Sequence, residues 1–262
     1  MIEALRLFAA FVRVAVHREV AYRANLVAQT VQSVVGLGTA LGGLAVVFAH
    51  TATLAGWPPS ELVALVGVFQ MVGGAIGFAI QPAMQRLMEE VRTGALDFTL
   101  LQPADSQVLV SVREVSVYRL TDVALGAALL GAALARLGAR LGPGRIAAFT
   151  LALAAGGAVV YAVWLALATC AFWWVRVDNV LVIFETLYDA GRWPVSIYPG
   201  WLRGALTFLI PVALATSVPV EALTGALRGR TLALAAVVAA AALVLSRLLW
   251  RAGLRAYSGA SG

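Results

Sequence analysis

The sequence predicts an all-α membrane protein. Of its 262 residues, 61% are hydrophobic and only 12% are charged, and the mean hydropathy is +0.90. A soluble domain of this length has too few interior positions to bury so many Leu, Val and Ala residues. Lipid must therefore surround most of the chain, which is best divided into helices of about 20 residues, the length that crosses a bilayer.

The charged residues and the single cysteine exclude several classes of protein. The net charge is +6, and all 19 basic residues are Arg. In a membrane protein such an excess sets the orientation of the chain, and no basic face interleaved with aromatic residues, as nucleic-acid binding requires, is present. Cys170 alone allows neither a disulfide framework nor a Cys-based metal site. We therefore expect no nucleic-acid partner and no metal.

Residues 1–24 predict an amphipathic helix. Apolar residues recur at helical spacing on one face, namely at Leu5, Ala9, Val12, Val16 and Val20. Arg6, Arg13 and His17 share a different face. A helix with one apolar and one basic side is suited to the headgroup layer of a membrane, so we expect it to lie along the membrane surface.

Five segments are apolar enough and long enough to span the bilayer. They are residues 26–48, 61–84, 115–137, 146–175 and 231–250. The third belongs to a helix predicted from about residue 108 to residue 137, in which Arg119 and Asp122 can pair because they are three apart.

Two of these spans carry small residues at a spacing of four. They are Gly38 and Gly42 in the first span and Gly73 and Gly77 in the second. This spacing lets another helix approach closely, although it is common in chains rich in Gly.

The Arg residues predict the orientation. Arg6, Arg13, Arg18 and Arg23 precede the first span, and Arg86, Arg92, Arg113 and Arg119 cluster between the second and third spans. The loop 49–60 has none. Because cytoplasmic loops carry the excess of basic residues, we expect both termini and residues 85–107 on the cytoplasmic side of the cell (inner) membrane. Arg136, Arg140 and Arg145 would then lie outside, but the contrast within the first hairpin is cleaner.

An acidic stripe marks residues 177–192. Asp178, Glu185 and Asp189 recur at steps of seven and four, so a helix would place them on one face, near Arg192. Carboxylates inside a membrane are costly. They either form structural pairs with Arg near the interfaces or line a hydrated pathway, in which Glu185 would favour cationic cargo.

The residues after this stripe form a short apolar segment. Residues 206–218 are apolar, but Pro211 and Pro219 interrupt them, and so short a run is typical of a re-entrant piece. In the alternative topology the fifth span lies at 204–220 and residues 177–200 are cytoplasmic.

Residues 90–103, with the sequence EVRTGALDFTLLQP, separate the second and third spans. They are too polar to cross a bilayer and too rich in Leu and Phe to be a free linker. We expect a helix to continue to residue 91 with Glu89 and Glu90 in water, Gly94 to break it, and an apolar edge to follow until Pro103. Such an edge is typical of a docking element for a cytoplasmic partner, or of a loop that lies on lipid headgroups.

Two motifs carry a resemblance to a known family. The first is Arg92-x-Gly94-x-Leu96-Asp97-x-x-Leu100-Leu101-x-Pro103, and the second is Pro194-x-x-x-Tyr198-Pro199-x-Trp201, followed by Pro211 and Pro219. The first resembles the cytoplasmic loop of ABC-2 type permeases, and the second resembles the segment that precedes their last span. The closest branch is the short six-span permeases that pair with a separate ATPase, and the order of elements resembles theirs over essentially the whole chain.

The resemblance implies a fold and a function. The fold would be an elbow helix (1–24), six transmembrane helices with 177–192 as the fifth, and an outer re-entrant hairpin (199–222) before the last. Residues 85–107 would be the coupling segment, in which Glu89, Glu90 and the first motif contact the ATPase. The chain would be a non-catalytic permease subunit of an ATP-driven exporter, with two ATP-binding subunits and a second permease, identical or related, as partners.

The sequence itself agrees that the energy comes from another chain. It contains no Lys and no Gly-x-x-x-x-Gly-Lys-Ser/Thr loop, so ATP and Mg²⁺ would bind to the partner.

Two other functions stay open. Asp178, Glu185 and Asp189 are suited to the relay of an ion-coupled secondary transporter, although no inverted repeat of that class is evident. An intramembrane enzyme acting on lipid would have to combine this stripe with His17 or His50, and no motif of such enzymes accompanies them.

Overall fold

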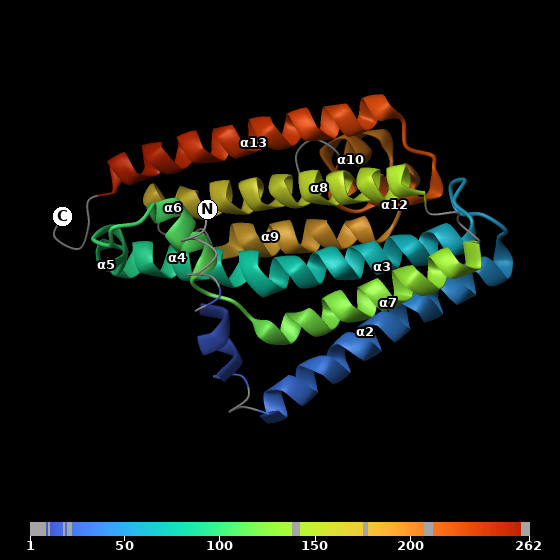
Figure 1. Ribbon diagram of the computed structural model, residues 1–262, viewed down its shortest axis with the longest axis horizontal. Coiled ribbons are helices and arrows are strands. Elements are labelled where there is room, and N and C mark those ends of the chain that lie inside the picture. Colours follow the sequence, from blue (N-terminus) through green and yellow to red (C-terminus); the bar gives the residue numbers. More distant parts are fainter. Residues whose placement is uncertain are drawn as a thin grey trace.

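Long helices that run in roughly one direction make up most of the fold (Figure 1). The computed structural model describes residues 9, 11–17, 19, 23–137, 142–174, 178–206 and 212–257. In this part of the chain five helices are long and apolar enough to cross a membrane: Leu26–His50, Pro59–Thr93, Val117–Leu137, Pro143–Phe172 and Gly229–Ala256. The described residues form no strand, and the prediction of an all-α membrane protein is confirmed.

The second of these helices is interrupted by a π-turn. It consists of α3 (Pro59–Ala75), η1 (Ile76–Ile80) and α4 (Gln81–Thr93). Pro82 lies just after the π-turn and has no N–H to donate to the carbonyl of Phe78, four residues earlier. That carbonyl instead accepts a hydrogen bond of 2.9 Å from the Ser116 N–H, so the π-turn also anchors the start of the next span.

Gly94 ends α4, as the sequence predicts. Its φ of 75° lies in the left-handed region, where a glycine carries no steric penalty. The chain therefore reverses sharply into α5 (Leu96–Leu100).

The prediction of one helix from residue 108 to residue 137 is wrong. The structure has α6 (Ser106–Val112), then η2 (Val117–Arg119) and α7 (Leu120–Leu137). Between them Ser116 is extended, with φ −115° and ψ 94°. The hydrogen bond from Ser116 to Phe78 is available only in a non-helical backbone, which explains the break.

Helices α3 and α7 pack with their backbones in contact. A Cβ added at Gly126 would lie 2.5 Å from the Met71 nitrogen and 2.6 Å from the Gly67 oxygen, and one added at Gly67 would lie 2.9 Å from the Leu130 nitrogen. Only glycine permits this approach. The pair forms a central seam of the bundle, with Leu65 and Val68 of α3 buried.

A second pair of helices lies on the other side of α3. Here α8 (Pro143–Thr169) packs against α13 (Gly229–Ala256) and against the short helices α11 (Val212–Ala215) and α12 (Ser217–Thr224). A Cβ at Gly156 would lie 2.5 Å from the Leu214 oxygen. Figure 1 shows α13 at one edge of the bundle and α2 at the other.

Helix α2 (Arg23–His50) is mostly exposed. A Cβ at Gly38 or Gly42 would meet no atom within 4 Å, so this pair of small residues packs against no other part of the described chain. The second pair does pack, because a Cβ added at Gly73 would lie 3.6 Å from the Tyr188 ring and one added at Gly77 would lie 2.8 Å from Arg119 Nε.

Short helices fill the region of the predicted fifth span and re-entrant hairpin. They are α9 (Asp178–Asp189), η4 (Ala190–Arg192), η5 (Val195–Ile197), α10 (Gly200–Gly204), α11 and α12. The 12 residues of α9 extend about 18 Å at 1.5 Å per residue, less than the roughly 30 Å of a hydrocarbon core. The five candidate spans therefore do not include 177–192, whose crossing stays a prediction.

The predicted elbow helix lies largely outside the described residues. Residues 11–17 are helical, as expected. The remainder of 1–24 is described only at residues 9, 19, 23 and 24.

Candidate functional site

An apolar knob protrudes at one end of the bundle, where α5 lies (Figure 1). The buried side chain of Leu96 anchors α5, whereas Phe98 is 75% and Leu101 is 82% exposed. Leu100 is partly exposed at 38%. We define Phe98, Leu100 and Leu101 as the α5 knob. The sequence predicts an apolar edge of Leu96, Phe98, Leu100 and Leu101, and the structure exposes the last three but buries Leu96. Pro103 follows in an exposed turn.

A buried ionic network holds this knob on α4 and α6. Glu90 is only 5% exposed. Its carboxylate accepts hydrogen bonds from Arg86 Nε at 2.9 Å and from Thr99 Oγ1 at 3.3 Å, and it forms an ion pair with Arg113. Arg113 also donates to Thr99 Oγ1 at 2.6 Å. Burial lowers the pKa of the Arg113 guanidinium, and the nearby Arg86 charge adds to this effect.

The expectation that Glu90 lies in water is wrong. The reversal at Gly94 folds α5 back over the end of α4, so that Thr99 covers the Glu90 carboxylate. Glu89 is exposed as expected and lies 3.8 Å from Arg92, which is exposed too. Glu90 therefore positions α5, and the exposed residues are those free to meet a partner.

Asp97 connects α5 to the C-terminal end of α13. Its carboxylate lies beside the Tyr257 hydroxyl. The pKa of Tyr257 is raised mainly by burial and, to a smaller extent, by the Asp97 carboxylate. The Tyr257 ring packs on Phe172 with centroids 5.7 Å apart, and Phe172 packs on Trp250 at 5.6 Å. The α5 knob thus rests on the last span as well as on α4.

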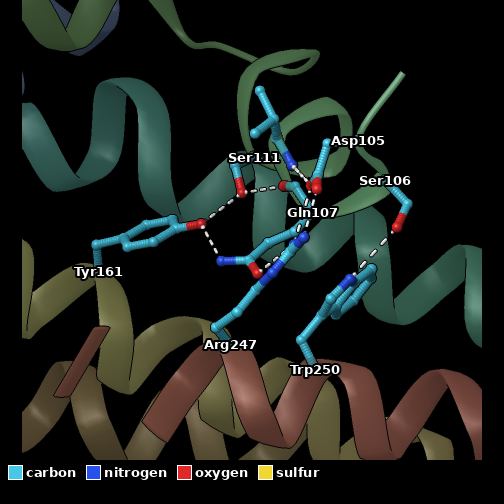
Figure 2. Close-up of polar contacts among 8 residues, drawn as sticks. Asp105, Ser106, Gln107, Ser111, Tyr161, Arg247 and Trp250 are labelled. Carbon is cyan, nitrogen blue, oxygen red and sulfur yellow. Dashed lines mark hydrogen bonds and ion pairs between the residues drawn. The ribbon is translucent and has the colours of Figure 1, made fainter. Parts of the chain in front are cut away.

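Figure 2 shows a second clamp, between α6 and α13. Asp105 caps α6 by accepting from the Val108 N–H at 3.2 Å. Both of its carboxylate oxygens also accept from Arg247, one of them at 2.9 Å, and Arg247 donates to Gln107 Oε1 at 2.8 Å. The Arg247 guanidinium lowers the pKa of Asp105.

The same clamp reaches α8. Gln107 Nε2 donates to the Tyr161 hydroxyl at 3.2 Å, and the Ser111 and Tyr161 hydroxyls share a hydrogen bond of 2.8 Å (Figure 2). Trp250 Nε1 donates to Ser106 Oγ at 3.4 Å. Sequence reasoning missed this network, although an Arg and a Trp three residues apart inside an apolar span are a signal for it.

A polar cavity of about 450 Å³, open to the surface, lies between α2, α3, α7, α8 and α9. Arg119 and Asp122 line it and form the predicted pair at 3.4 Å. Gln70 donates a 2.8 Å hydrogen bond to Asp122, and Gln81 donates a short one to Glu185.

The acidic stripe is only partly assembled there. Glu185 and Asp189 line the cavity, whereas the side chain of Asp178 lies outside the described residues. Arg192 does not pair with Asp189 in the described structure, and its guanidinium lies over the Phe69 ring, 5.3 Å from the centroid. Sequence spacing alone favoured the ion pair, whereas the structure places the guanidinium on an aromatic face.

The residues of the second motif brace the turn between α9 and α10. The Tyr198 hydroxyl donates to the Ala190 carbonyl at 2.9 Å, and Pro199 precedes α10. Pro194 is buried, and Trp201 is 76% exposed. Pro219 is buried within α12, whereas Pro211 lies outside the described residues.

Fold and sequence now define a class, a multi-pass membrane protein. The family model described as "ABC-2 family transporter protein" matches residues 34–261, and the chain belongs to this family. It is therefore an ABC-2 type permease, a membrane component of an ABC transporter. No curated protein and no solved structure matches it.

Proposed function

We propose that this chain is the permease subunit of an ATP-driven exporter and that a separate ATP-binding subunit docks on the α5 knob. The observation that carries the proposal is the exposure of Phe98 and Leu101 at the end of the bundle. Large apolar side chains that protrude together are typical of an interaction site. Glu89 and Arg92, both exposed, supply a polar rim beside them.

The connections of the α5 knob support its role in transmitting force. The Glu90–Arg113–Thr99 network fixes α5 to α4 and α6, and the Asp105–Arg247 clamp fixes α6 to α13. A push on the α5 knob therefore reaches α3 through α4 and reaches the last span through Arg247. Hydrogen-bonded ion pairs favour one arrangement of the helices, and most strongly so where they are buried, as at Glu90.

The remaining parts of the proposal follow from the family. Two copies of the ATP-binding subunit bind ATP and Mg²⁺. A second permease, identical or related, completes the transport path. Residues 177–192 are the fifth span, 199–222 the re-entrant hairpin, and both termini lie in the cytoplasm of a cell whose inner membrane holds the protein.

Co-purification with the ATP-binding subunit tests the docking site. The double variant Phe98→Ala with Leu101→Ala removes most of the exposed apolar surface of the α5 knob. We expect about ten-fold less ATP-binding subunit to co-purify with it and the rate of ATP-driven transport to fall by about the same factor. The matched control is Trp201→Ala, because Trp201 is as exposed but lies at the opposite end of the bundle, on α10 (Figure 1).

Two outcomes would contradict the proposal. One is full retention of the partner by the double variant. The other is transport driven by a pH gradient in ATP-free vesicles, which would favour an ion-coupled secondary transporter that uses Glu185 and Asp189 of the cavity.

A further inference from the structure

We propose that the polar cavity binds a lipophilic cation, a bulky apolar molecule that carries one positive charge, and that Glu185 is the carboxylate that receives this charge. The inference rests on the proposed function, because it assigns the cavity to the transported cargo. It names the chemical class of that cargo.

The charges of the cavity wall do not balance. Asp122, Glu185 and Asp189 supply three carboxylates, whereas Arg119 and Arg192 supply two guanidinium groups. Among the described residues, α2 and α8 contribute no titratable group to this wall. The described part of the wall therefore carries an excess of one negative charge, which is costly within a membrane unless a cation enters.

The hydrogen bonds show which carboxylate holds the excess. Asp122 is 5% exposed and has a partner at each carboxylate oxygen, Gln70 at Oδ1 and Arg119 at Oδ2. Arg192 is held over Phe69. Glu185 has no ion pair among the described residues, and the hydrogen-bond donor that it has there is the uncharged amide of Gln81.

Aromatic side chains line the cavity beside these acids. Phe69 and Tyr188 are stacked with centroids 5.1 Å apart, and Trp164 also contributes to the wall. Aromatic faces next to a carboxylate are the usual environment for a cation that carries apolar groups.

The size and depth of the cavity agree with this class of ligand. Its volume of about 450 Å³ lies in the range of sites for drug-sized molecules. The residues that helix Pro59–Thr93 contributes run from Phe69 to Gln81, about 15 to 33 Å along the helix from Pro59. These residues belong to a helix long and apolar enough to cross a membrane, where an apolar body is favoured and a lone anion is not.

Equilibrium binding to the full-length chain in lipid nanodiscs tests the inference. The probes are radiolabelled tetraphenylphosphonium and tetraphenylborate, which share a shape and differ in the sign of the charge. Each is measured separately, and binding to empty nanodiscs is subtracted. We expect saturable binding of tetraphenylphosphonium and at least ten-fold weaker binding of tetraphenylborate.

Three variants locate the site. Glu185→Gln keeps the shape of the side chain and should weaken tetraphenylphosphonium binding at least ten-fold, and Asp189→Asn should weaken it about three-fold. Glu221→Gln, at a carboxylate outside the cavity wall, should bind as the unchanged chain does. Equal binding of the two probes overturns the inference without any variant, as does unchanged binding to Glu185→Gln.

The result is separable from the docking test. If the ATP-binding subunit fails to dock while tetraphenylphosphonium still binds through Glu185, the proposed function fails and the cavity assignment stands. If docking is intact and the unchanged chain does not bind tetraphenylphosphonium, the cavity assignment alone is wrong.

Discussion

The α5 end of the bundle and the polar cavity both gather acidic and basic side chains, but only at the α5 end do the charges match. There Glu90 has Arg86 and Arg113, and Asp105 has Arg247. In the cavity Arg119 is committed to Asp122 and Arg192 to an aromatic ring. Glu185 and Asp189 have no ion pair among the described residues.

The difference separates two uses of charge. Matched and hydrogen-bonded charges hold helices in one arrangement, and removal of one partner leaves the other buried and uncompensated. Unmatched charges in a region of low dielectric constant lower stability. Side chains that stay unmatched there are expected to serve a ligand, so removal of a charge should cost much stability at the α5 end and little in the cavity.

The largest effect is expected at Glu90. Glu90→Leu leaves Arg113 buried without its partner and should lower the free energy of unfolding by about 3 kcal/mol, as measured by chemical denaturation in detergent micelles. Glu89→Gln is the matched control, since Glu89 is exposed, and it should cost less than about 0.5 kcal/mol. Equal losses in the two variants would mean that the Glu90 network stabilises nothing.

An intermediate effect is expected at Asp105. Asp105→Asn removes one charge of the clamp to Arg247 and should cost roughly 0.5–1 kcal/mol at pH 7. The folded pKa of Asp105 is lowered by Arg247, so its contribution is complete above the unfolded pKa of about 3.9 and is lost as the pH falls through the lower folded value.

Thermal unfolding at several pH values checks this expectation. The difference in stability between the unchanged chain and Asp105→Asn should be constant between pH 5 and pH 7 and should shrink below about pH 4. A difference that grew on acidification would have the wrong sign for a lowered pKa.

The smallest effect on stability is expected at Glu185. Glu185→Gln keeps a polar partner for Gln81 and removes an unmatched charge from the membrane interior. The free energy of unfolding should change by less than about 1 kcal/mol, in either direction. A loss as large as that of Glu90→Leu would show that Glu185 is structural, and the contrast between the two regions would disappear.

The sequence predicted the features that depend on local order. Runs of apolar residues predicted the five long helices, and the spacing of Arg119 and Asp122 predicted their ion pair. Gly94 predicted the end of α4. Each of these depends on residues close together in the chain, where helical periodicity is enough.

Contacts between distant residues were not predictable in this way. Asp105 and Arg247 are 142 residues apart, and nothing local pairs them. The close approach of Gly67 and Gly126 involves single glycines on two helices, without the repeated spacing that marked Gly38 and Gly42. The burial of Glu90 depends on α5 folding back, which a pattern of polar residues does not indicate.

The π-turn at Ile76–Ile80 changes which side of the long second helix contacts its neighbours. An α-helix rotates by about 100° per residue, and the wider turn accommodates one extra residue. Everything beyond it is thus set at a new angle, so that α3 faces α7 while α4 faces α5, α6 and α8. Removing a single residue there would rotate Glu90 away from Arg113 by about 100°. Helix α5 would then lose the ionic network that holds it on α4.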